Sequence, residues 1–228
     1  MRDLLIENGQ LIAVAVAGVE AFLALILLIL AIAKKKAAIV LMFLIALGLT
    51  FDSAVVAFGS SFSETLLDIL SKCRYVAHGL LLPLTVAICA YVLEWEYSIG
   101  MKLSWLLSIL LCGGGAAAGW FRETALSTFA GITRYAPTAS SPEWAEMVGK
   151  YMPIGMVALL LISGLVYIIR HKRPFIFLGG LCMLGFSLIG PLTGNTDLIF
   201  LLSMFGEVLL LLFYMLHAAT GYKEEGLL

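Results

Sequence analysis

The sequence predicts an all-α membrane protein, a bundle of seven transmembrane helices forming a single domain over residues 1–228. The chain is 62% hydrophobic and only 13% charged, with a mean hydropathy of +1.05. Soluble domains are nearer half apolar and a quarter charged. Seven apolar runs are each long enough, at about 1.5 Å per residue, to cross a hydrocarbon layer of about 30 Å. These runs lie at 10–33, 37–58, 73–93, 103–121, 151–169, 174–192 and 198–219.

Each run is expected to be a helix, because unpaired backbone groups are too costly to leave in lipid. A β-barrel would instead show short segments of alternating polarity. Asp3 and Glu7 stand where a cleavable signal peptide would carry basic residues, so the first run is expected to remain in the mature protein.

The distribution of basic residues predicts how the bundle is oriented. Eight of the fourteen lie on one side of the predicted bundle, and the shortest turns hold the densest clusters, which is typical of the cytoplasmic face. The N-terminus is then outside, the C-terminus is cytoplasmic, and the cell membrane is the expected location. The eight are Lys34, Lys35, Lys36, Lys102, Arg170, Lys172, Arg173 and Lys223.

Two connections on the predicted outer side carry structure of their own. Residues 63–70 are expected to form a short amphipathic helix lying at the membrane interface. In the longer 122–150 segment, Ser141 is the expected N-cap of a helix, Pro142 its first residue, and Trp144 a headgroup contact. This segment is either a passive interfacial tether or a lid. Between these connections, the Gly113–Gly115 run predicts a helix packed closely against its neighbours.

Composition excludes several classes of function. The net charge is −1, so no basic face indicates a nucleic-acid partner. The four cysteines stand singly in apolar runs and are interpreted as small core residues. The motifs of soluble zinc proteases, serine hydrolases and phosphate-binding loops are absent from the sequence.

Ionisable side chains inside the apolar runs are the strongest functional signal, because each costs roughly 2.5–3.5 kcal/mol at mid-membrane on insertion scales. They come from four separate runs, yet their depths converge toward the outer half of the bundle. We therefore expect them to share one outward-facing polar cavity. The five are Glu20, Asp52, Arg74, His78 and Glu207.

Three carboxylates against one permanent cation predict an excess of negative charge in that cavity. A protonated His78, a protonated carboxyl or a bound cation would supply the balance. At the mouth of the last run, Asn195 and Asp197 either cap the helix or line the cavity entrance.

One short run resembles a known family. The residues from Arg74 to Leu84, RYVAHGLLLPL, resemble the third helix of microbial rhodopsins, and the seven-helix topology is similar as well. Glu207 stands where that family has a carboxylate in helix 7. The resemblance implies a bundle with Arg74 on the outer side of a central polar cavity and a bend at Pro83.

The departures from that family exclude its chemistry. Leu211 stands where the family keeps the lysine that forms the retinal Schiff base, so covalently bound retinal is not expected. Ala77 and His78 replace the counter-ion aspartate and the tryptophan. The run from Phe175 to Gly180 has no counterpart of the aromatic box.

Three functions remain open. The leading hypothesis is a membrane protein that binds a small molecule, or moves a proton or cation, through the cavity. The first alternative is an intramembrane hydrolase acting on a lipid-like substrate, with Glu20, Asp52, His78 and Glu207 as metal ligands. The second is a structural or partner-binding subunit, in which buried ion pairs only fix helix register. The lipid bilayer is an expected partner, and self-association to a homo-oligomer is left open.

Overall fold

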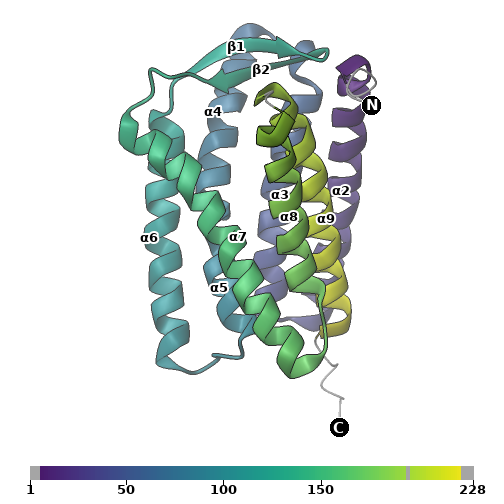
Figure 1. Ribbon diagram of the computed structural model, residues 1–228, viewed down its shortest axis with the longest axis vertical. Helices are drawn as coiled ribbons and strands as arrows, with labels where there is room; N and C mark the ends of the chain where they lie inside the picture. The colour runs from purple at the N-terminus through teal and green to yellow at the C-terminus, as the bar shows by residue number, and fades with distance from the viewer. Residues whose placement is uncertain (1–5, 194–195, 222–228) are drawn as a thin grey trace.

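A computed structural model describes residues 6–193 and 196–221, with side chains described throughout except at 190–199. The helices run side by side along one direction, and a β-hairpin lies across one end of the bundle (Figure 1). We call this the hairpin end. The elements are α2 (Gly9–Lys34), α3 (Ala37–Ala57), η1 (Gly59–Ser61), α4 (Glu64–Leu81), α5 (Leu84–Val92), α6 (Ile99–Phe121), β1 (Thr124–Phe129), β2 (Ile132–Pro137), α7 (Glu143–His171), α8 (Phe175–Thr193) and α9 (Thr196–Gly221).

The helices have the length and polarity of a multi-pass membrane protein. Within the described residues, six are long and apolar enough to cross a membrane, with α4 and α5 counted together as Glu64–Val92. The described apolar part of α8, Phe175–Ile189, is shorter. The prediction of an integral membrane protein is therefore confirmed, whereas the seventh crossing and the sidedness of the termini stay predictions.

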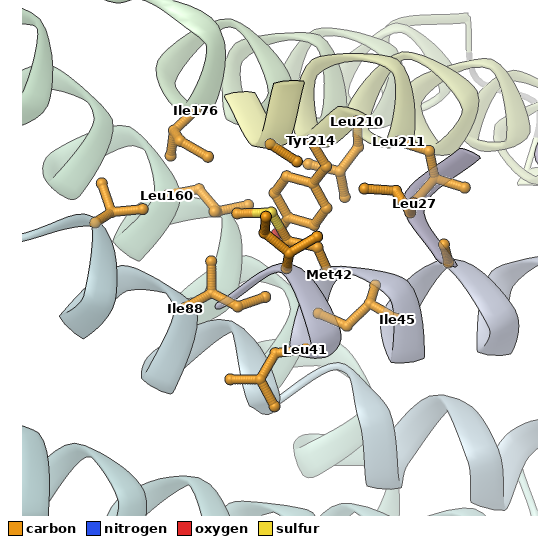
Figure 2. Packing of buried hydrophobic residues seen from close by; sticks show 14 of the residues in the cluster. Leu27, Leu41, Met42, Ile45, Ile88, Leu160, Ile176, Leu210, Leu211 and Tyr214 are labelled. Carbon is orange, nitrogen blue, oxygen red and sulfur yellow. The ribbon is translucent and has the colours of Figure 1, made fainter. Parts of the chain in front are cut away.

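A cluster of buried apolar side chains holds the middle of the bundle together. Met42 of α3, Leu27 of α2, and Leu211 and Tyr214 of α9 are completely buried against one another and their neighbours. Figure 2 shows these side chains converging from several helices around the Tyr214 ring. Such packing fixes the positions of the helices that carry the polar residues described below.

Residues 63–70 are not a separate interfacial helix, so that prediction is wrong. Ser63 caps α4 by accepting a hydrogen bond from the Leu66 backbone N–H at 3.4 Å. No proline or glycine interrupts the next fifteen residues, and the helix continues unbroken into the membrane-spanning part as far as Leu81. Leu67, which faces the bundle, is only 2% exposed.

The break between α4 and α5 lies at Pro83. Proline has no N–H for the helical hydrogen-bond ladder and its ring crowds the preceding turn, so a helix bends or ends there. The Pro83 carbonyl accepts two hydrogen bonds, one from the Val86 backbone N–H of α5 at 3.0 Å and one from the Ser108 hydroxyl of α6 at 3.2 Å. The rhodopsin resemblance implied a bend at this residue, and the structure has an interruption between α4 and α5 there.

The all-α prediction is wrong over residues 124–137, which form the antiparallel hairpin of β1 and β2. Pairing of Phe129 with Ile132 leaves a two-residue turn, in which Ala130 has φ 55° and Gly131 has φ 77°. Positive φ at both positions matches the twist of a two-residue hairpin turn, and glycine adopts it without strain.

The hairpin is attached to the bundle at several points. Ile132 is only 1% exposed and packs in a small apolar cluster with Ala13 of α2 and Val56 of α3. The Tyr75 hydroxyl of α4 donates to the Tyr135 carbonyl at 2.9 Å. A Cβ at Gly59 would lie 2.0 Å from the Thr133 carbonyl oxygen, so η1 and β2 are in backbone contact there.

The start of α7 also differs from the prediction. The helix begins at Glu143, eight residues before the apolar run predicted from 151, and Pro142 rather than Ser141 occupies the cap position. The Ser141 hydroxyl instead accepts a hydrogen bond from the Glu123 backbone N–H at 3.1 Å. Ser141 therefore closes the base of the hairpin instead of capping the helix.

Candidate functional site

An ion pair between α3 and α4 is the centre of the polar region. Arg74 Nε lies 2.8 Å from Asp52 Oδ1, and the two side chains are 4% and 21% exposed. Arg74 Nη2 donates to the Tyr75 hydroxyl at 3.0 Å. Arg74 Nη1 is buried and donates to no described group. Nε makes the ion pair with Asp52 but has no other described partner. A buried guanidinium with unused donors is costly, because each buried N–H normally has an acceptor.

These two residues open onto a cavity of about 220 Å³ at the hairpin end. Its walls come from α3, α4, α6, α7, β2 and α9. The lining residues are Asp52, Arg74, Tyr75, His78, Gly79, Gly115, Ala118, Gly119, Arg122, Arg134, Pro137, Val148, Gly149, Met152, Pro153 and Phe200. Three of the predicted site residues, Asp52, Arg74 and His78, therefore meet in one cavity.

Two further arginines line the same cavity and were not predicted. Arg122 follows the end of α6, with its guanidinium carbon 5.5 Å from the centre of the Tyr75 ring. Arg74 lies 4.8 Å from the same centre, so both cations are within cation–π range of Tyr75. Arg134 of β2 lies 3.7 Å over the Phe200 ring.

Position in the chain explains why these arginines were missed. Both belong to the 122–150 connection, which sequence reasoning treated as a tether or lid. Only the fold of the hairpin turns Arg134 toward the cavity. One signal was present in the sequence: Arg122 and Arg134 are two of the six basic residues outside the basic side of the predicted bundle.

Glycines allow the cavity walls to approach. A Cβ at Gly79 of α4 would lie 2.1 Å from the carbonyl oxygen of Gly115 of α6, so the two helices cross backbone to backbone. Nothing lies within 4 Å of a Cβ at Gly113 or Gly114. The predicted close packing is thus confirmed at Gly115 alone among the three. On α7, the Arg122 guanidinium occupies the space that a side chain at Gly149 would need.

The two deepest carboxyl groups lie outside the cavity wall. Glu20 of α2 is completely buried and Glu207 of α9 is 9% exposed. They interact electrostatically with each other and with Asp52. Neither Glu20 oxygen nor Glu207 Oε2 has a described hydrogen-bond partner, although the Ser53 hydroxyl is near Glu20.

The polar region therefore has two parts, an arginine-lined cavity and a buried carboxyl pair beside it. The predicted excess of negative charge is not found on the cavity wall, where three arginines face one carboxylate among the described lining residues. The expectation counted Glu20 and Glu207 as wall residues because depth along a helix does not show which way a side chain points. Asn195 lies outside the described residues.

The metal-dependent alternative gains no support from this geometry. Within the described residues, no three His, Cys, Asp or Glu side chains come together as a metal site would require. His78 and Asp52 line the cavity, whereas Glu20 and Glu207 do not.

The chain matches no known protein family and no curated protein sequence. Its function therefore has to be inferred from the geometry and charge of the site.

Proposed function

We propose that this protein is a seven-helix integral protein of the cell membrane that binds a small anion in the arginine-lined cavity. The hairpin end would face the outside of the cell, because the basic turns at Lys34–Lys36 and Lys172–Arg173 lie at the opposite end. The cavity then opens outward, as the sequence predicts.

The observation that carries the proposal is the unused donor capacity of Arg74. Guanidinium groups present N–H donors in a planar fork that matches the oxygens of a carboxylate or phosphate. Asp52 offsets the charge of Arg74 but leaves Nη1 without an acceptor in the described part of the chain. Arg74 also lines the cavity, so an anion bound there would lie next to this guanidinium.

Arg122 strengthens the preference for an anion over a cation. It forms no ion pair with a described carboxylate, and its neighbours are the Tyr75 ring and the backbone of Gly149. Lys72 adds a further positive charge nearby, since its Nζ donates to the Arg122 carbonyl at 2.6 Å. A cation would meet repulsion from these groups on entering the cavity.

The test uses inorganic phosphate as the probe, with sodium chloride as the control at equal ionic strength. Phosphate at 100 times its dissociation constant is expected to stabilise the purified protein by about 2.7 kcal/mol. Arg122→Gln should abolish that stabilisation. Lys150→Gln removes the same charge from an exposed position next to Gly149, outside the cavity wall, and should retain it. Equal phosphate effects in the wild type and both variants would refute the proposal.

A second candidate function is favoured by the carboxyl pair. Glu20 and Glu207 are buried beside each other with oxygens that lack described partners, which is an arrangement suited to holding and exchanging a proton. Infrared difference spectra between acidic and alkaline conditions test it. A protonated-carboxyl band that disappears in Glu207→Gln or Glu20→Gln supports proton binding, and a spectrum unchanged in both variants refutes it.

A further inference from the structure

An apolar groove of about 440 Å³ lies between α6 and α7, next to the arginine-lined cavity. The groove and the cavity share three lining residues, Gly115, Val148 and Met152, so the two adjoin. The remaining groove residues are Leu110, Leu111, Gly114, Met147, Tyr151, Gly155 and Met156. None of the ten groove residues carries a formal charge.

Exposed aromatic side chains mark the level of the membrane surface beside this junction. Trp120 and Phe121 end α6, while Trp144 and Tyr151 lie on the first part of α7, and all four are exposed. Tryptophan and tyrosine concentrate at the depth of lipid headgroups. With these side chains at headgroup level, the cavity would lie at the same level and the groove would extend from it toward the hydrocarbon layer.

We propose that the anion is the phosphate headgroup of a membrane lipid, whose acyl chain lies in the groove between α6 and α7. This inference rests on the proposed function and names the class of ligand. An amphipathic anion satisfies both halves of the site, since arginines line one half and apolar side chains the other.

Phosphate fits the cavity better than a carboxylate does. The guanidinium groups of Arg74, Arg122 and Arg134 come from three different elements, α4, the end of α6 and β2. A carboxylate offers two oxygens in one plane, whereas a tetrahedral phosphate offers oxygens in several directions, and paired arginine donors suit it well.

Two glycines keep the groove open. A Cβ at Gly114 of α6 or at Gly155 of α7 would meet no atom within 4 Å. A leucine at either position can therefore fill the groove without disturbing the helix contacts beneath it. Gly113 is equally uncrowded but does not line the groove, so it provides a matched control.

The experiment uses a single-chain alkyl phosphate with a diazirine at the end of its chain, in micelles of an uncharged maltoside detergent that carries no phosphate. The same chain ending in an alcohol is the control probe. Photolabelling by the phosphate probe is expected at groove residues farther from the cavity, such as Leu110 and Met156. In Arg122→Gln it should fall to the level of the alcohol probe, and in Lys150→Gln it should not change.

Groove-filling variants separate this inference from the proposed function. Gly114→Leu and Gly155→Leu should lose groove labelling but keep stabilisation by inorganic phosphate, and Gly113→Leu should keep both. The lipid inference is overturned if phosphate stabilises the protein but the groove is not labelled, or if labelling is unchanged in Arg122→Gln. Neither result would contradict the anion site itself. Failure of inorganic phosphate to stabilise the wild type overturns both.

Discussion

The glycine contact between α4 and α6 gives a quantitative prediction for a matched pair of substitutions. In Gly115→Ala, the new Cβ would lie 2.2 Å from the Gly79 carbonyl oxygen and 2.9 Å from the Met152 methyl group. Ordinary van der Waals contact begins at 3.4 Å. The Met152 methyl group can turn away, but the Gly79 oxygen belongs to a helix backbone, so the helices must separate.

Gly114→Ala is the control, because its Cβ meets no atom within 4 Å. Overpacking at a rigid contact costs about 1–3 kcal/mol. Alanine at an uncrowded helical position instead stabilises by roughly 0.5–1 kcal/mol relative to glycine. The free energies of unfolding of the two variants should therefore differ by at least about 1.5 kcal/mol, with Gly115→Ala the less stable.

Thermal unfolding of both variants in one detergent, followed by far-UV circular dichroism, measures the difference. At about 2–4 °C per kcal/mol for a chain of this size, Gly115→Ala should melt several degrees below Gly114→Ala. Equal melting temperatures, or a lower one for Gly114→Ala, would show that the helices do not touch at Gly79 and Gly115.

Three other predictions concern the site and its surroundings. Asp52→Leu leaves the buried Arg74 without its counter-ion and should destabilise by about 3–5 kcal/mol, whereas Asp52→Leu with Arg74→Met should recover much of that loss. A thermal double-mutant cycle checks this, and additive losses would argue against the ion pair. Gly131→Val forces a branched side chain to φ 77° and should cost roughly 1–2 kcal/mol. The expected result is faster hydrogen exchange confined to β1 and β2. Unchanged exchange would show that Gly131 does not adopt the positive φ described for the turn. Tyr75→Phe removes the hydrogen bond to β2 and should lower the free energy of unfolding by about 0.5–1.5 kcal/mol. Hydrogen exchange in β2 should become faster, and unaltered exchange would show that the contact is absent.

The helices were predictable from sequence because the cost of placing polar backbone and side chains in lipid acts locally along the chain. A run such as 10–33 is apolar at nearly every position, and α2 at Gly9–Lys34 agrees with it closely. The extension of α4 back to Glu64 was not predictable in the same way. Its first turns lie beyond the apolar run, and the cap at Ser63 is equally compatible with a separate short helix.

The hairpin and its arginine depend on tertiary contacts that a single sequence does not reveal. Residues 124–137 are short and partly polar, and their strand structure is stabilised by packing of Ile132 and by the bond from Tyr75. Without the hairpin, Arg134 has no predictable direction. The depths of Glu20 and Glu207 along their helices could be predicted from their positions in the apolar runs. Their separation from the cavity could not, because it depends on how each helix is rotated about its axis.

The most direct test of the anion site is a map of a heavy anion bound to the protein. Crystals grown with selenate, an oxyanion of similar shape to phosphate, allow selenium to be located by anomalous diffraction. A peak in the cavity between the guanidinium groups of Arg74 and Arg122 is the predicted result. Ordered selenate elsewhere on the protein, with none in the cavity, would contradict the proposal.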